Sequence, residues 1–394
     1  MPGSVIVAGA RTPIGKMSGS LADFTAMDLG GIAIKEALSR AKVAADRVQY
    51  IFMGQVLQAG QGQITARQAG VKAGIPMTVP ATTINKVCLS GLNAIYLADL
   101  MITAGEADIV VAGGMESMTR APYLLNQARS GYRFGNGDLV DSMLHDGLFC
   151  AFDQVAMGLG TERYCTHFPG VSRQRQDSFS ANSHERAANA IKEGRFAPEI
   201  IPVTIPQRKG DPIVVDTDEG VRPGTTTESL SKLRPAFDQS GTITAGNSSQ
   251  ISDGAAALIV VSRKVADQLG VDPLGEVLSY GQVAGPDASL LTQPSRSILS
   301  ALSKIGKQVT DVDLFEMNEA FAAVALASMD DLGISDDIVN VNGGAVALGH
   351  PIGASGARLA LTLLTELKRR GGGIGAASLC GGGGQGDALI VKSL

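Results

Sequence analysis

Two cysteines in the sequence stand where a thiol could act as a nucleophile or a base. Cys88 lies in the run N-K-V-C-L-S-G, just before an expected helix, and Cys380 lies in S-L-C-G-G-G-G-Q-G. A free cysteine is commonly a packing residue, and by position alone packing is the favoured interpretation of Cys88. A thiol at a helix start, however, has its pKa lowered and becomes a nucleophile. The rest of the chain decides between these interpretations.

Two polar residues add to this chemistry. His350 stands between Gly349 and Pro351 in a polar loop, which favours a general base over a structural histidine. Asn318 begins N-E-A-F directly after an expected strand, and on position alone it could be a turn residue with positive φ. Cys380 follows an apolar strand, but the four glycines after it leave it few packing partners, which favours function.

Short apolar strands alternate with helical patterns at both ends of the chain. In the N-terminal part the patterns predict strands over 5–8, 48–53 and 109–112, and helices over 27–42 and 90–104. We expect Gly9 to close the first of these strands and Gly113-Gly114 the last. This alternation predicts an α/β fold.

The two ends of the sequence also repeat one pattern. Ser90-Gly91 and Ser355-Gly356 each head a helix that leads to a strand and a glycine pair or run, and they stand 265 residues apart. Met53 and Asn318, at the ends of two other strands, are separated by the same 265 residues. A constant offset over separate elements predicts a duplicated α/β half. In such a pseudo-twofold arrangement, the loops of both halves can converge on one site.

An insertion separates the two halves. Between 119 and 247 prolines and charges become denser, and the sequence predicts an amphipathic helix capped by Ser172 and ended by Gly194. We therefore expect an N-terminal half of residues 1–118 plus 248–270, an inserted loop subdomain of 119–247, and a C-terminal half of 271–394.

With these motifs in place, the chain resembles the thiolase family. N-G-G-A-V-A-L-G-H-P-I-G-A-S-G (342–356) matches the histidine signature of that family, and L-C-G-G-G-G-Q-G (379–386) its C-terminal cysteine signature. The resemblance runs from Val5 to the C-terminus and implies the thiolase fold, with duplicated layered αβαβα halves. It also implies reversible condensation of two acetyl-CoA molecules to acetoacetyl-CoA and CoA.

The resemblance assigns roles to the residues above. Cys88 would be acylated, with His350 as its general base, and Cys380 would take a proton from the methyl group of a second acetyl-CoA. His350 and a water held by Asn318 would stabilise the enolate oxygen. The backbone N–H groups of Cys88 and Gly382 would stabilise the tetrahedral oxygen, and glycines at 381–384 would let such donors reach a ligand.

Contacts to CoA are implied in the same way. The resemblance places Arg222 at the adenine nucleotide and Ser249 at the pantetheine arm, and it assigns the acyl pocket to Leu148, Met157, Ala320 and Phe321. CoA is a substrate and product here, so no cofactor is expected. The glycines of 381–386 also match the dinucleotide pattern G-x-G-x-x-G, but only eight residues follow them, so we expect no nicotinamide cofactor.

Composition excludes several other classes. The net charge of −5 gives no basic footprint for nucleic acid or a membrane surface. The four cysteines include no C-x-x-C pair, so neither a disulfide framework nor a metal site is expected. Cys150 and Cys165 are interpreted as structural, and His145, His167 and His184 are assigned no chemistry. Neither a signal peptide nor an 18-residue apolar run is apparent, which predicts a cytoplasmic protein. The resemblance implies a homotetramer, a dimer of dimers.

Two departures from the short-chain biosynthetic pattern bear on specificity. Ala156 stands where those thiolases usually carry a histidine, and Leu290-Leu291 stand where a second methionine is common in their substrate pocket. Both changes are expected to keep that pocket apolar. A 3-ketoacyl-CoA thiolase of broader chain length is therefore the near alternative. A decarboxylating ketosynthase, which usually has a second histidine in place of Cys380, and a non-catalytic acyl-CoA-binding protein are the alternatives from other classes.

Overall fold

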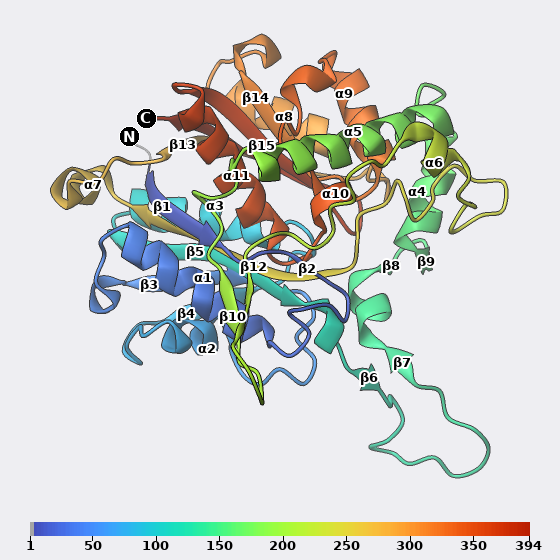
Figure 1. The fold of residues 1–394 in the computed structure, drawn as a ribbon, viewed down its shortest axis with the longest axis horizontal. Coiled ribbons are helices and arrows are strands. Elements are labelled where there is room, and N and C mark those ends of the chain that lie inside the picture. Colours follow the sequence, from blue (N-terminus) through green and yellow to red (C-terminus); the bar gives the residue numbers. More distant parts are fainter. Residues whose placement is uncertain (1–3) are drawn as a thin grey trace.

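One mixed β-sheet, built from two arms, runs through the molecule (Figure 1). The structure is a computed structural model that describes residues 4–394. Its ten-stranded sheet has the order β14-β15-β16-β13-β1-β12-β5-β3-β4, with β2 paired to β12. The N-terminal arm contains β1 (Val5–Arg11), β12 (Ser252–Val261), β5 (Ile109–Ser117), β3 (Tyr50–Gly54), β4 (Ala81–Ile84) and β2 (Gly15–Lys16). The C-terminal arm contains β13 (Gly275–Ala284), β16 (Gln385–Ser393), β15 (Gly373–Gly381) and β14 (Leu314–Met317).

The two arms repeat one topology about their junction. The arms meet where β1 pairs with β13, with Val5 opposite Glu276. Outward from this junction, each arm has two antiparallel pairings followed by a parallel one: β1-β12-β5-β3 on one side and β13-β16-β15-β14 on the other. The predicted duplication is therefore confirmed at the level of strand order and direction.

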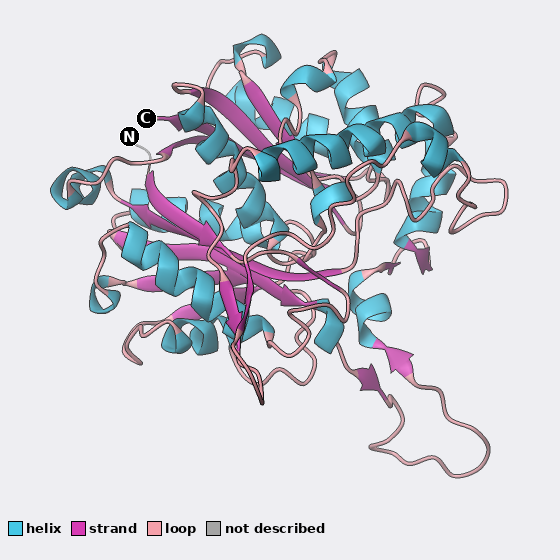
Figure 2. Ribbon diagram, viewed as in Figure 1, coloured by secondary structure: helices cyan, strands magenta, loops and turns pink. Residues whose placement is uncertain are grey.

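Helices complete five layers (Figure 2). The helices α3 (Ser90–Thr103) and α11 (Ser355–Arg369) contact each other and strands of both arms, so they form the middle layer. On the outer faces, α1 (Ala26–Arg40) and α2 (Thr65–Lys72) cover the N-terminal arm, and α8 (Gln293–Lys304) and α9 (Ala322–Leu332) pack on the C-terminal side. This αβαβα arrangement is the fold that the resemblance implies.

The two middle helices meet at their first turns, and glycine allows it. A Cβ added to Gly356 would lie 2.3 Å from the Leu92 backbone nitrogen, and one added to Gly91 would lie 2.9 Å from the nitrogen of Ala357. No real side chain tolerates such contacts, so these glycines set the separation of the helix starts. The loops that precede the two helices are brought together in consequence.

Glycine does not end the strands as expected. β1 continues through Gly9 to Arg11, and β5 continues through Gly113 and Gly114 to Ser117, so both predicted strand ends are wrong. The glycines serve close packing instead. A Cβ on Gly114 would lie 2.0 Å from the Gly353 carbonyl oxygen, and one on Gly9 would lie 2.7 Å from the Leu361 side chain.

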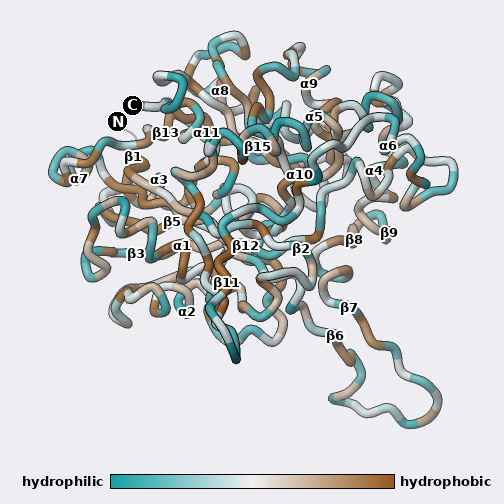
Figure 3. Tube along the Cα trace, in the orientation of Figure 1, coloured by the Kyte–Doolittle hydropathy of each residue, from teal (hydrophilic) through white to brown (hydrophobic). Residues whose placement is uncertain are grey.

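Between β5 and β12 the chain leaves the sheet. Its longest element is α5 (Arg173–Lys192), which is capped by Ser172 as predicted and followed by Gly194 at φ 69°. The shorter elements of this segment are β6 (Tyr123–Leu124), β7 (Val140–Asp141), β8 (Phe149–Cys150), β9 (Val155–Ala156), α4 (Met157–Cys165), β10 (Val203–Ile205), β11 (Ile213–Val215) and α6 (Thr227–Ser231). Two short helices, α7 (Arg263–Leu269) and α10 (Ala345–Leu348), come after β12 in the chain. The hairpin of β6 and β7 projects from the body, and hydrophobic residues colour parts of it brown in Figure 3.

Buried charges fasten the insertion to the sheet. The Arg11 guanidinium, at the end of β1, donates to both Asp218 oxygens at 2.7 and 2.9 Å and to Glu199 at 2.6 Å. The three side chains are buried, and a buried charge is tolerated only when it is paired in this way. No helix among residues 4–394 is long and apolar enough to cross a membrane.

Candidate active site

Cys88 and His350, which are 262 residues apart in the chain, face each other across the middle layer. Cys88 Sγ lies 3.3 Å from Nε2 of His350. Cys88 occupies the tight turn between β4 and α3, where Val87 has φ 51°. A positive φ is strained for a β-branched residue and is typical of functional turns. Ser90 holds the turn, since its hydroxyl donates to the Val87 carbonyl at 2.7 Å and accepts the Lys86 N–H at 2.8 Å.

The tautomer of His350 follows from its second nitrogen. Nδ1 lies 2.6 Å from the Ser355 hydroxyl oxygen, and that hydroxyl lies 3.0 Å from the Pro351 carbonyl oxygen. The carbonyl can only accept, so Ser355 donates to it and in turn accepts from Nδ1–H. The network thus assigns the proton to Nδ1 and leaves the Nε2 lone pair directed at Cys88. This is the arrangement of a general base beside a nucleophile.

Burial keeps both partners neutral at rest. It raises the pKa of the Cys88 thiol to about 12, with the Glu116 charge as a further cause. It lowers the pKa of His350 to about 3, with the Arg358 charge adding to the effect. The expectation that the helix start lowers the thiol pKa is therefore wrong, because desolvation outweighs the helix terminus. The nucleophile has to be generated by proton transfer to His350 as it attacks.

Asn318 completes this face of the site. It follows β14 and is fully buried, and its Nδ2 lies 3.3 Å from Nε2 of His350. Asn318 has no positive φ, which removes the turn-residue interpretation. Its Oδ1 has no hydrogen-bond partner among the described residues. A buried amide with an unpaired oxygen beside the base can hold a small polar group there.

Cys380 lies at the end of β15, against the Cys88 turn. A Cβ on Gly381 would lie 2.6 Å from the Leu89 side chain, and one on Gly382 would lie 3.5 Å from Val87. Burial raises the pKa of the Cys380 thiol, and the nearby Cys88 raises it further. Contrary to expectation, Cys380 does have packing partners: it is 1% exposed within the apolar cluster around α8 and α9.

Three of the four glycines after Cys380 serve the chain's own geometry. Gly383 and Gly384 have φ values of 78° and 67°, and Gly381 makes room for Leu89, while a Cβ on Gly382 would meet only ordinary contacts. No contact within the described protein requires glycine at 382, so the role of its N–H toward a ligand stays a prediction. The G-x-G-x-x-G match is followed by strand β16, so the helix that a dinucleotide site needs does not follow it.

A cavity of about 380 Å³ opens beside His350. Five of the residues assigned to CoA and acyl contacts line it: Leu148, Met157, Ser249, Ala320 and Phe321. Met118, Ala156, Phe237 and Ile352 add to an apolar wall. Leu290 and Leu291 are buried in the core cluster instead, so the expectation that they shape the substrate pocket is wrong.

Arg222 lies in a neighbouring cavity of about 210 Å³. Ala245 and Gln250 line both cavities, so the two are adjacent. The Arg222 backbone N–H donates to Nδ1 of His184 at 3.1 Å. Burial lowers the pKa of His184 to about 4, and the Arg222 charge acts in the same direction. Sequence reasoning assigned His184 no role, and the structure shows that it holds the Arg222 loop.

Glu116 is a buried carboxylate that sequence reasoning missed. It accepts backbone N–H bonds from Val56 at 3.0 Å, Leu57 at 3.1 Å and Gly353 at 2.9 Å. Burial raises its pKa to about 7. The predicted strand stopped at 112, so Glu116 stood outside it, and no signal marked it as part of a buried strand. Ser355, the partner of His350, was visible only as a helix start.

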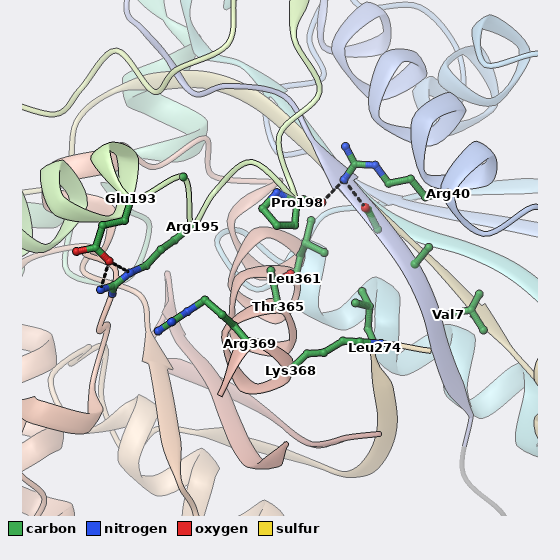
Figure 4. Close-up of a pocket in the computed structure, with 13 residues that line it drawn as sticks. Val7, Arg40, Glu193, Arg195, Pro198, Leu274, Leu361, Thr365, Lys368 and Arg369 are labelled. Atoms are coloured by element: carbon green, nitrogen blue, oxygen red, sulfur yellow. Dashed lines mark hydrogen bonds and ion pairs between the residues drawn. The ribbon is translucent and has the colours of Figure 1, made fainter. Parts of the chain in front are cut away.

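Another cavity, of about 570 Å³, lies by the far end of α11 (Figure 4). Each of its four basic residues is paired with an acidic one: Arg195 with Glu193 at 2.6 Å, Arg369 with Glu366 at 2.7 Å, Arg40 with Glu36 at 2.8 Å and Lys368 with Asp272 at 2.6 Å. Basic side chains at a helix C-terminus stabilise the helix dipole. None of the predicted site residues lines this cavity. Within residues 4–394, no group of three or more His, Cys, Asp or Glu side chains is arranged to hold a metal ion.

The fold and the contact between Cys88 and His350 indicate the class of protein. The family described as thiolase, N-terminal domain matches residues 4–264, and that described as thiolase, C-terminal domain matches residues 271–393. The chain therefore belongs to the thiolase family.

Relatives with printed names agree with this assignment. The chain is 56% identical over 393 residues to a probable acetyl-CoA acetyltransferase of Mycobacterium tuberculosis, covering 100% of both chains. It is 51% identical to an acetyl-CoA acetyltransferase of Cupriavidus necator, over 98% of each. The crystal structure of the Bacillus anthracis acetyl-CoA acetyltransferase superposes with a TM-score of 0.97 at 38% identity, covering 100% of this chain and 99% of that one.

Proposed function

We propose that this protein is an acetyl-CoA C-acetyltransferase that condenses two acetyl-CoA molecules reversibly to acetoacetyl-CoA and CoA. One observation carries the proposal: the 3.3 Å contact of Cys88 Sγ with the unprotonated Nε2 of His350, at the wall of an apolar cavity. A thiol beside a base suits acyl transfer, because attack on a thioester makes another thioester at little cost in free energy.

In the first half-reaction an acetyl group moves from CoA to Cys88. His350 takes the Cys88 proton as the sulfur attacks the thioester carbonyl, and the C–S bond to CoA then breaks. The backbone N–H groups of Cys88 and Gly382 stabilise the tetrahedral oxygen. The departing CoA thiolate takes its proton from Cys380. The site is left with acetyl-Cys88, a Cys380 thiolate and a His350 imidazolium, which together carry no net charge.

The second half-reaction forms the carbon–carbon bond. The Cys380 thiolate removes a proton from the methyl group of a second acetyl-CoA and becomes a thiol again. The enolate oxygen is stabilised by the imidazolium and by a water bound at Asn318. The enolate carbon attacks the acetyl-Cys88 carbonyl and the C–S bond breaks. Cys88 recovers its proton from His350, and acetoacetyl-CoA is released. Each group regains its starting protonation state, since Cys380 keeps the methyl proton in place of the one it gave to CoA.

Broader chain length is the second candidate, and the cavity wall favours it. Ala156, where the short-chain pattern has a histidine, lines the cavity with Met118 and Met157. Methionine adapts its shape to different apolar ligands. Each additional buried CH₂ of the acyl chain contributes about 0.8 kcal/mol to binding. Thiolysis rates for 3-ketoacyl-CoAs of increasing length decide between a maximum at acetoacetyl-CoA and one at longer chains.

Mass spectrometry after incubation with acetyl-CoA tests the chemistry itself. We expect an acetyl adduct on Cys88, absent in C88S, and release of CoA without malonyl-CoA. A protein that binds acetyl-CoA without forming the adduct would be an acyl-CoA-binding protein. Condensation only with malonyl-CoA would identify a decarboxylating ketosynthase. Either result contradicts the proposal.

We further propose a homotetrameric assembly, a dimer of dimers. The projecting hairpin supports this, because it exposes apolar side chains at Tyr123, Leu125, Phe134 and Leu139 that a monomer would leave in water. The edge strand β4 ends the sheet with unpaired backbone groups, which favours pairing with a second copy. Light scattering of the intact protein, and of a variant with residues 126–138 replaced by a Gly-Ser turn, tests the oligomeric state. A monomeric intact protein would contradict it.

A further inference from the structure

An ion pair joins the loops of the two reactive cysteines. Lys86 Nζ lies 2.8 Å from Oδ1 and 2.9 Å from Oδ2 of Asp387. Lys86 precedes Cys88 by two residues in the N-terminal half. Asp387 lies on β16 of the C-terminal half, opposite Leu379 and next to the register pair of Cys380 with Gly386. The pair therefore ties the turn of one thiol to the strand end of the other.

The acidic partner is held firmly. Asp387 is 0% exposed, and the Tyr280 hydroxyl donates to its Oδ2 at 2.7 Å. The Tyr280 ring stacks on Tyr96 of α3 with centroids 4.2 Å apart. The Lys86 side chain is 21% exposed. A fully buried carboxylate is costly unless it is paired, so Lys86 is drawn to one position relative to β16.

Apolar contacts also lie between the two loops near the thiols. Gly381 packs on Leu89, and Gly382 faces Val87. Such contacts are non-directional and leave some freedom for one loop to slide over the other. A bidentate, charge-assisted pair is directional and removes that freedom. It also acts beside Val87, the strained residue that aims Cys88.

We propose that Lys86 and Asp387 are positioning residues that fix the separation of the two thiols, and that they act on carbon–carbon bond formation rather than on acyl transfer. The inference rests on the proposed function. In condensation, Cys380 must reach a methyl proton of the second substrate while that carbon faces acetyl-Cys88. Acyl transfer depends less on the exact position of Cys380. A CoA thiolate is a far weaker base than a carbanion, so it can depart with little proton donation from Cys380. Misplacing reacting atoms by about 1 Å costs about a hundredfold in rate.

Two rates measured on the same intact protein test this. Exchange of isotopically labelled CoA into acetyl-CoA reports acyl transfer through Cys88, and acetoacetyl-CoA formation reports condensation. For K86M and for D387N we expect condensation to fall about 10- to 100-fold and exchange to fall less than about threefold. In the double variant K86M/D387N both charges are removed, so neither is left unpaired in the core. We expect its condensation rate to match the single variants.

Two further variants serve as references. K86R keeps a cation at the position and should retain most of the condensation rate. K72M removes a lysine whose pair with Asp28, at 2.7 Å, lies away from the thiols, and it should leave both rates unchanged.

The proposal is overturned if exchange and condensation fall by the same factor, as they would after general loss of structure. It is also overturned if the losses of the two single variants multiply in the double variant, because the residues would then act separately. A wild-type protein that catalyses neither reaction would refute the proposed function and this inference with it. A wild-type protein active in both, with variants that match it, would refute only the inference.

Discussion

His350 donates its Nδ1 proton to Ser355 at 2.6 Å, and this contact sets which nitrogen faces Cys88. Ser355 is the first residue of α11, and its hydroxyl is fixed by the Pro351 carbonyl at 3.0 Å. The helix start thus acts as the orienting group that a nucleophile–base pair requires. Both partners come from the same G-H-P-I-G-A-S-G segment, so the base and its orienting residue are placed by one loop.

Removing the Ser355 hydroxyl should impair the base. In S355A the Nδ1–H is left unpaired in a buried site, which costs about 1–3 kcal/mol. Since about 1.4 kcal/mol is tenfold in rate, kcat should fall about 10- to 100-fold with a smaller change in KM. The control is S328A, which removes a buried serine that donates to the Leu291 carbonyl at 2.8 Å, away from the thiols. Equal loss of kcat in both variants would contradict the orienting role.

Alkylation of Cys88 reports its protonation state at rest. Burial raises the thiol pKa to about 12, so little thiolate exists at neutral pH. The rate of iodoacetamide labelling at Cys88, followed by peptide mass spectrometry, should therefore keep rising about tenfold per pH unit from pH 7 to 10. A peptide of residues 85–91 should level off near its pKa of about 8.5. A plateau below pH 8 in the protein would instead reveal a resting thiolate–imidazolium pair.

The sequence predicted the duplication because the repeat is encoded in helix starts. Ser90-Gly91 and Ser355-Gly356 must let α3 and α11 cross closely, and that demand leaves the same small residues in both halves. The signatures around His350 and Cys380 likewise placed both residues in one site. Periodicity could not place the strand ends, because Gly9 and Gly114 resemble terminators while their role is to admit Leu361 and Gly353.

Electrostatic contacts between residues far apart in the chain could not be predicted from the sequence. The pKa of Cys88 depends on burial and on Glu116, and neither is readable from N-K-V-C-L-S-G. His184 and Arg222 are 38 residues apart, and only the fold of the insertion brings them together. The Lys86 pair with Asp387 spans 301 residues between the two halves. Such contacts have no local pattern, so a single sequence does not reveal them.

Acid should weaken the protein through His184. Its pKa is lowered from 6.5 to about 4 in the fold, so the unfolded chain takes up a proton between these pH values while the folded one does not. Stability is therefore lost as pH falls from 6.5 toward 4, by up to about 1.4 kcal/mol per pH unit. In H184Q an amide oxygen can still accept the Arg222 N–H, but it does not titrate. The midpoint temperature of H184Q should thus fall less between pH 7 and 4.5 than that of the wild type.

The comparison of the two proteins removes the other titrating groups. His350 and the buried carboxyls of Glu116 and Glu316 are present in both, so their contributions cancel in the difference. Parallel pH profiles for wild type and H184Q would contradict a neutral, buried His184.

Breaking the Arg11 cluster should detach the insertion from the sheet. R11M leaves the buried carboxylates of Asp218 and Glu199 facing each other without a cation, which costs about 3–5 kcal/mol. The exposed pair of Lys232 and Glu228 is the control, because K232M should change stability by less than about 0.5 kcal/mol. Thermal unfolding of R11M and K232M measures both changes in stability.

The same variant links stability to the substrate site. Asp218 lies four residues before Arg222, so loosening its anchor should disturb the cavity where Arg222 and His184 meet. Cys88, His350 and Asn318 do not contact Arg11, and their geometry should persist below the unfolding temperature. KM for acetyl-CoA should therefore rise in R11M while kcat changes little. A fall in kcat at constant KM would show that Arg11 supports the thiol site and not the insertion.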